Sequence, residues 1–122
     1  MSAQEIGKKL VQFCQDGKNL ESINTLYSPD IVSVEAGAPP GQERITKGID
    51  AVRAKNQWWT ENHEIHSAEV YGPFPHGDEK FAVRFVYDAT NKPSKQRFKM
   101  EEVAVFTLAN DKVVREEFFY SM

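Results

Sequence analysis

Two glutamates occupy positions where the surrounding pattern predicts apolar side chains. Glu35 directly follows the strand-like run at residues 31–34, and Glu102 lies within a long segment of alternating polarity at residues 95–108. In that segment Glu102 is in phase with the apolar residues, so a strand there would turn its carboxyl group toward the interior. A carboxylate buried among apolar side chains costs several kcal/mol unless it is paired, or it takes up a proton and stays neutral.

Two carboxyl groups in one apolar cavity can carry out proton transfer. The better-solvated group ionises and acts as a base, whereas the drier group keeps its proton and donates a hydrogen bond to a developing oxyanion. This division suits the removal of a proton next to a carbonyl group. The alternative is structural: Glu102 pairs with Arg84 or Arg115, or a β-bulge turns its side chain outward.

The three histidines give a weaker signal. His63 and His66 flank Glu64 and Ile65, and these residue types can bind a metal ion. The pair straddles a predicted junction between a helix and a strand, and His76 lies in a distant turn. We therefore predict no metal site. His63 is instead a candidate acid–base or polar group of a pocket, or a histidine that the dipole stabilises at a helix end.

Three helices are predicted in the first half of the chain. Residues 3–16 have apolar side chains at helical spacing, and Gly17 ends this helix. A short second helix covers residues 20–26. Thr46 has the side chain of an N-cap, and we predict the third helix over residues 47–62.

The third helix carries two adjacent tryptophans, Trp58 and Trp59. Adjacent side chains point about 100° apart on a helix, so we expect one of them to line a pocket. The other would cover the pocket mouth or a contact with a second copy of the chain. Packing within the core is the alternative explanation for either residue.

The second half of the chain changes from a period of 3.6 residues to a period of two. Residues 72–78 are rich in glycine and proline and predict a turn, and Asn110-Asp111 predicts a tight hairpin. Helices followed by a run of strands indicate an α+β fold, in which helices cover one face of a curved antiparallel sheet. Strands are predicted at residues 31–35, 65–71, 81–88, 95–108 and 113–120.

The bulk properties are those of a single domain over residues 1–122. Hydrophobic residues make up 40% of the chain, and 15 basic against 18 acidic residues give a net charge of −3. The negative charge disfavours nucleic acid as a partner, because proteins that bind it present a basic face. No apolar run is long enough for a membrane span, and the N-terminus lacks the pattern of a secretory signal. Cys14 is a single cysteine, which predicts no internal disulfide and a cytoplasmic location.

The order of these elements resembles the NTF2-like superfamily, which includes the SnoaL-like polyketide cyclases and the ketosteroid isomerases. The residues that carry the resemblance are Asp16-Gly17, "LYSPDIVSVEAG" (26–37), "KGIDAVRAKNQWW" (47–59) and "EEVAVFTLANDKVVREEFF" (101–119). The resemblance covers nearly the whole chain. It implies a cone-shaped fold, in which a curved antiparallel sheet packs on three N-terminal helices and encloses a pocket. It says less about function, because this fold hosts enzymes, carriers and association domains.

The resemblance to ketosteroid isomerases implies roles for both glutamates. Glu35 falls where those enzymes keep their catalytic carboxylate, and Glu102 falls near their hydrogen-bond-donating acid. Their catalytic tyrosine should fall near Leu10, which cannot donate a hydrogen bond. That departure argues against true ketosteroid isomerase activity, and Tyr27 and Tyr87 are the candidate substitutes.

The SnoaL-like cyclases and related epoxide hydrolases use an acid in the last strand. Either Glu116 or Phe118, two residues on, stands at this place in the chain. Glu116 and Glu117 are adjacent and must point to opposite faces of a strand. A bulge would exchange them, so the sequence leaves open which of the two faces the interior.

We therefore expect a domain that binds a small, largely apolar ligand. If it is an enzyme, we expect a cofactor-free isomerase or lyase that transfers a proton on a carbonyl compound; the alternative is a non-catalytic ligand-binding or association domain. In either case the resemblance implies a homodimer through the sheet face. Glu35 is the predicted base and Glu102 the predicted proton-bearing donor. The predicted pocket-lining residues are Tyr27, Trp58, Trp59, His63, Tyr87, Met100, Glu116 and Phe118.

Overall fold

The computed structural model describes residues 2–38 and 41–120. These residues form three helices: α1 (Ala3–Gln15), α2 (Asn19–Leu26) and α3 (Ile49–Asn62). They also form six strands: β1 (Tyr27–Val34), β2 (Ile45–Lys47), β3 (His63–His76), β4 (Lys80–Asn91), β5 (Gln96–Ala109) and β6 (Lys112–Phe119). Among the described residues, no helix combines the length and apolar character that crossing a membrane requires.

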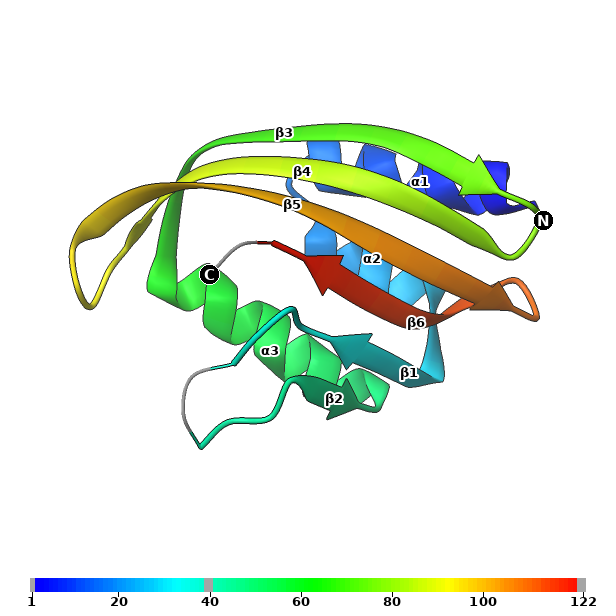
Figure 1. The fold of residues 1–122 in the computed structure, drawn as a ribbon, viewed down its shortest axis with the longest axis horizontal. Helices are drawn as coiled ribbons and strands as arrows, with labels where there is room; N and C mark the ends of the chain where they lie inside the picture. The colour runs from blue at the N-terminus through cyan, green and yellow to red at the C-terminus, as the bar shows by residue number, and fades with distance from the viewer. Residues whose placement is uncertain (1, 39–40, 121–122) are drawn as a thin grey trace.

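The strands form one curved, unclosed sheet in the order β2-β1-β6-β5-β4-β3. The helices α1 and α2 lie across one face of this sheet, and α3 lies beside its β1–β2 end (Figure 1). The predicted α+β fold is therefore confirmed. The sheet is not wholly antiparallel, however, because β1 pairs with β6 in parallel. Local periodicity cannot reveal this pairing, which joins two segments about eighty residues apart.

The start of α3 differs from the prediction. Thr46 does not cap this helix; it lies in β2, opposite Ser33 of β1. The N-cap is Gly48, whose φ of 91° suits a residue without a side chain, and its N–H donates to the carbonyl of Ile31 at 2.8 Å. Three residues are too few to show a strand period, which is why β2 is missing from the predicted elements.

The strand β3 continues through the segment that was predicted as a turn. Its pairing with β4 shifts register between Tyr71 and Phe74, and Gly72 and Pro73 occupy this irregularity. Gly72 has a φ of 132°, which favours glycine. Glycine and proline here mark a bulge within a long strand rather than its end.

The core lies between α1 and the middle of the sheet. Ile6 and Leu10 of α1, Phe81 of β4 and Phe106 of β5 are each at most 2% exposed. The rings of Phe81 and Phe106 stack with centroids 5.0 Å apart. This packing fixes the inner face of β5, on which Glu102 also lies.

Candidate active site

A cavity of about 620 Å³ lies between the helices and the sheet. Its lining is mostly apolar, and all three helices and five of the strands contribute to it. Both candidate glutamates and seven of the eight predicted lining residues belong to its wall: Glu35, Glu102, Tyr27, Trp58, Trp59, Tyr87, Met100, Glu116 and Phe118. The remaining candidate, His63, does not.

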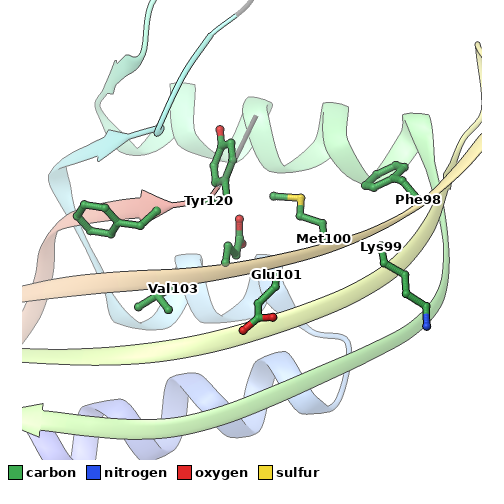
Figure 2. A pocket seen from close by; sticks show the side chains of 8 residues that line it. Phe98, Lys99, Met100, Glu101, Val103 and Tyr120 are labelled. Carbon is green, nitrogen blue, oxygen red and sulfur yellow. The ribbon is translucent and has the colours of Figure 1, made fainter.

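Strand alternation turns Glu102 into this cavity. Figure 2 shows the alternation on β5, with Met100 projecting from one side of the strand and Glu101 from the other. Glu102 is only 9% exposed. Burial, followed by repulsion from Glu35 and Glu116, raises the pKa of Glu102 to about 8, so that its carboxyl group is mainly protonated at pH 7.

The structural alternative for Glu102 does not hold. Arg84 binds Glu101 at 2.7 Å, and Arg115 binds Glu117 at 3.2 Å. The side chain of Glu102 makes no hydrogen bond or ion pair with any other described residue. Its carboxyl oxygens therefore face the cavity without a hydrogen-bond partner among the described residues.

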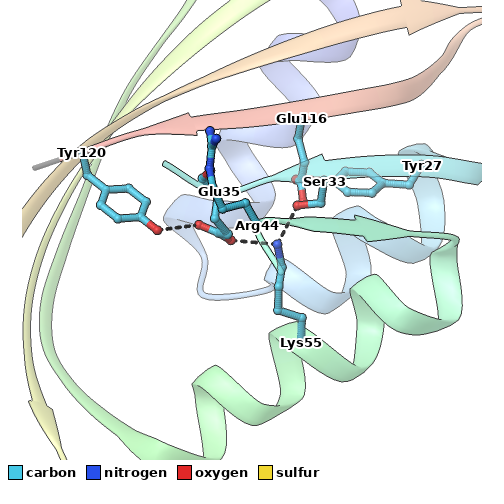
Figure 3. Close-up of polar contacts among 7 residues, drawn as sticks. All are labelled: Tyr27, Ser33, Glu35, Arg44, Lys55, Glu116 and Tyr120. Carbon is cyan, nitrogen blue, oxygen red and sulfur yellow. Dashed lines mark hydrogen bonds and ion pairs between the residues drawn. The ribbon is translucent and has the colours of Figure 1, made fainter. Parts of the chain in front are cut away.

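Glu35 follows the end of β1 and is held from several sides. Its backbone N–H donates to the carbonyl of Arg44 at 2.8 Å, and its own carbonyl accepts from Nε of Arg44 at 3.0 Å. Nζ of Lys55 lies 2.8 Å from one carboxylate oxygen, and the hydroxyl of Tyr120 donates to the other at 2.9 Å (Figure 3). A cation thus contacts one oxygen of Glu35 and a hydroxyl donor contacts the other, and these are partners that a carboxylate favours.

Lys55, Ser33 and Tyr120 are site residues that the sequence analysis missed. Lys55 also donates to Oγ of Ser33 at 2.6 Å, so its ammonium group bridges β1 and the carboxylate of Glu35. A signal for Lys55 did exist, since it falls on the same face of α3 as the buried Val52 and the cavity residue Trp59. A lysine on the inner face of a helix indicates that an acidic side chain lies within its reach, and for Lys55 that side chain is Glu35.

Glu116 is the third carboxyl group of the cavity. It is 4% exposed, whereas Glu117 turns outward to Arg115, so the structure settles which of the two faces inward. Tyr27 donates a hydrogen bond to Glu116, and Ser33 hydrogen-bonds it as well. Burial raises the pKa of Glu116, and its two hydrogen bonds act in the opposite direction.

The two candidate tyrosines have different surroundings. The hydroxyl of Tyr27 donates its hydrogen to Glu116, so it cannot donate a hydrogen bond to a ligand. Tyr87 is hydrogen-bonded by Asn19, and burial, followed by the charge of Glu102, raises the pKa of its hydroxyl. Both tyrosines line the cavity, and Tyr87 is the one whose hydroxyl lies within the electrostatic influence of Glu102.

His63 lies behind the tryptophans rather than in the cavity wall. Its ring stacks on Trp59 with centroids 3.7 Å apart, and Nδ1 lies 2.9 Å from the carbonyl of Trp59. Trp58 and Trp59 both contribute to the cavity, and Trp58 remains 59% exposed at its mouth. In the described residues, no group of three His, Cys, Asp or Glu side chains could hold a metal ion.

Comparison with known proteins identifies the relatives of this fold. The family model of the SnoaL-like domain matches residues 1–120. A candidate SnoaL-like polyketide cyclase, also described as a carbohydrate phosphatase, from Mesorhizobium loti is 38% identical, covers 98% of this chain and 100% of its own, and superimposes with a TM-score of 0.91. No curated protein matches the chain significantly.

More distant solved structures show the same fold. An NTF2-like protein from Burkholderia thailandensis is 16% identical, with a TM-score of 0.80 and coverage of 99% of this chain and 92% of that one. A candidate isomerase from Bacillus subtilis is 13% identical, with a TM-score of 0.76 and coverage of 93% and 82%. The resemblance to the NTF2-like superfamily inferred from the sequence is confirmed.

Proposed function

Since this chain belongs to the SnoaL-like domain family, we propose that it binds a small, largely apolar carbonyl compound and moves a proton next to the carbonyl group. The reaction would be an isomerisation, a cyclisation or a dehydration, and it would use the side chains of this chain without a cofactor. A cavity of about 620 Å³ has the size and apolar character of a small-molecule site.

The single observation that carries this proposal is the difference between two carboxyl groups that line one cavity. Glu35 forms an ion pair with Lys55, whereas Glu102 has no partner among the described residues and burial raises its pKa to about 8. Glu35 takes a proton from the carbon next to the carbonyl. Glu102 donates a hydrogen bond to the carbonyl oxygen as negative charge develops there, and the apolar surroundings strengthen that bond.

The groups around Glu35 have a positioning role in this mechanism. Lys55 and Tyr120 each occupy one carboxylate oxygen, which fixes the orientation of the group. Each carboxylate oxygen has two lone-pair sites, so one site on each remains for the substrate proton. After the transfer, Glu35 returns the proton to a different atom of the substrate, which completes an isomerisation.

A panel of β,γ-unsaturated cyclic ketones tests the proposal, because their conversion to conjugated enones is followed by ultraviolet absorbance. We expect turnover by the natural protein and a large loss of kcat in Glu35→Gln and Glu102→Gln. Glu101→Gln is the matched control, since Glu101 is the neighbour of Glu102 on the opposite face of β5. Equal rates in Glu102→Gln and the control would refute the assigned role of Glu102.

We also propose that two copies of the chain pair through the outer face of the sheet. Tyr71, Arg84, Val103 and Phe119 are opposite one another across four neighbouring strands, and the three apolar members of this row are 37–50% exposed. An exposed apolar row on a sheet is typical of an interface. Light scattering should give a dimer for the natural protein and a monomer for Val103→Glu; a monomer for both would exclude the pairing.

A reducing, cytoplasmic location is part of the same proposal. Cys14 is a buried free thiol, and burial raises its pKa to about 12. Such a thiol is chemically inert and is retained for its packing.

A further inference from the structure

One edge of β5 lacks a neighbouring strand next to the cavity. β5 covers fourteen residues, but β6 covers only eight and pairs with it no farther than Val103, which is opposite Phe119. Over residues 96–102, β5 therefore has a strand neighbour on the β4 side alone within the described sheet.

The direction of the backbone groups along this edge follows from the register. The N–H of Leu108 donates to the carbonyl of Glu79 at 2.7 Å, so the even-numbered residues of β5 face the β4 side. Successive residues of a strand turn their N–H and C=O groups to alternate sides. Arg97, Lys99 and Glu101 consequently present a backbone donor and acceptor to the open edge.

A groove of about 720 Å³ follows this edge and adjoins the cavity. Met100, Glu102 and Tyr120 line both spaces, which places the groove directly beside the cavity. Phe98 lies farther along the groove, on the same side of β5 as Met100 (Figure 2). A ligand that passes these three side chains would extend from the cavity along the edge of β5.

We propose that the ligand carries a secondary amide on an extended chain, and that this amide pairs with the backbone of Lys99 while the carbonyl end reaches Glu102. The inference rests on the proposed function for the placement of the carbonyl group. A secondary amide offers one donor and one acceptor, as a missing strand would. Lys99 is three residues from Glu102, roughly 10 Å along the strand, which sets the separation of the two groups in the ligand.

A small ligand fits this edge better than a peptide. The inner end of the edge leads into the cavity at Glu102, where a peptide backbone would meet apolar walls without partners for its polar groups. The open stretch is also short, because β5 begins at Gln96, directly after the turn that joins it to β4. One amide with an apolar chain on each side satisfies the backbone and the flanking side chains Phe98 and Met100.

A pair of probes tests the amide directly. The probes are 8-acetamidooctan-2-one, in which six methylene groups separate the ketone from the secondary amide, and 8-acetoxyoctan-2-one, in which an ester oxygen replaces the amide N–H. We expect the ester probe to bind about five-fold more weakly, as the loss of one hydrogen bond predicts. In nitrogen-15 NMR spectra, the amide probe should shift the amide signals of Lys99 and Glu101. Equal affinities, or shifts confined to Trp58 and Trp59, would overturn the inference.

Lys99→Pro gives a second test, because it removes the N–H at the open edge and leaves the ladder with β4 intact. This variant should bind the two probes equally well, whereas Lys99→Ala, which keeps the N–H, should retain the five-fold preference. Circular dichroism establishes whether each variant folds. If Lys99→Pro does not fold, the comparison of the two probes on the natural protein remains the test of the inference. Loss of the preference in Lys99→Ala would assign the effect to the side chain and contradict the proposal.

Two further outcomes separate this inference from its rivals. If N-acetyl-tetra-alanine amide shifts the signals of Arg97, Lys99 and Glu101 at lower concentration than 8-acetamidooctan-2-one, the edge binds peptides and the inference is wrong. If the amide preference is found while Glu102→Gln leaves ketone isomerisation unchanged, the proton-transfer function fails and the amide site stands. If ketone isomerisation depends on Glu102 but no amide preference is found, the proton-transfer function stands and the amide site is excluded.

Discussion

Replacing Glu102 with glutamine should stabilise the protein, and the gain should depend on pH. In the folded protein burial raises the pKa of Glu102 from its ordinary 4.5 to about 8. Between these values the folded state binds more protons than the unfolded state, so the stability contributed by this group falls as the pH rises. Glutamine has nearly the same shape and no charge. The free energy of unfolding of Glu102→Gln should therefore not fall with pH through this group.

The size of the effect follows from the shift. One pKa unit corresponds to about 1.4 kcal/mol, so the full shift amounts to about 5 kcal/mol above pH 8 and about 3 kcal/mol at pH 7. Below pH 4.5 both side chains are neutral and the two proteins should be equally stable. Because Glu102 has no hydrogen-bond or ion-pair partner among the described residues, the substitution leaves no orphaned group behind.

Urea denaturation at pH 4.5, 7 and 8.5 measures this difference, with the fluorescence of Trp58 and Trp59 as the probe. Comparing the two proteins at each pH cancels the titration of the groups that do not interact with Glu102. Glu101→Gln is again the control: it loses an exposed ion pair with Arg84, so its difference from the natural protein should be small and constant from pH 7 to 8.5. A stability difference for Glu102→Gln that does not change with pH would show that Glu102 is charged or well solvated.

Three other predictions concern the same site and its supports. The rate of ketone isomerisation should fall as the pH rises through about 8, because Glu102 then loses the proton it donates; a rate that stays constant to pH 9 would exclude that role. Tyr27→Phe removes a donor from the buried Glu116 and should lower the free energy of unfolding by about 1–3 kcal/mol in urea titrations. Gly48→Ala places a side chain at a φ of 91°, where the surroundings leave space but the backbone is strained. It should cost about 1 kcal/mol or more by thermal unfolding, and no change in Tm would contradict that account.

The sequence predicted the features that depend on local periodicity. Alternation along residues 95–108 is enough to orient Glu102, and the paired positive φ angles of Asn110 and Asp111 bear out the tight hairpin. Glu116 was among the predicted lining residues, but the pattern alone could not decide between Glu116 and Glu117, because a register shift between β5 and β6 lies beside Val113. Such a shift changes which residues face inward without leaving a trace in the pattern.

Sequence analysis also could not predict which side chains contact the carboxylate of Glu35. Lys55 and Tyr120 reach Glu35 from twenty and eighty-five residues away, and only the packing of α3 and the end of β6 against β1 brings them together. A spacing rule cannot represent contacts of that kind. The position of Lys55 on the inner face of α3 was the one local clue.

The short β6 has a consequence for how this scaffold can be re-engineered. Because the open edge of β5 begins where β6 ends at Phe119, the number of residues in one strand sets how far a bound molecule can extend beyond the cavity. Lengthening β6 by design would occupy that edge with the chain's own backbone and restrict the protein to compact ligands. Ligand length would then be selected by strand length, while Glu35 and Glu102, and with them the chemistry, stay unaltered.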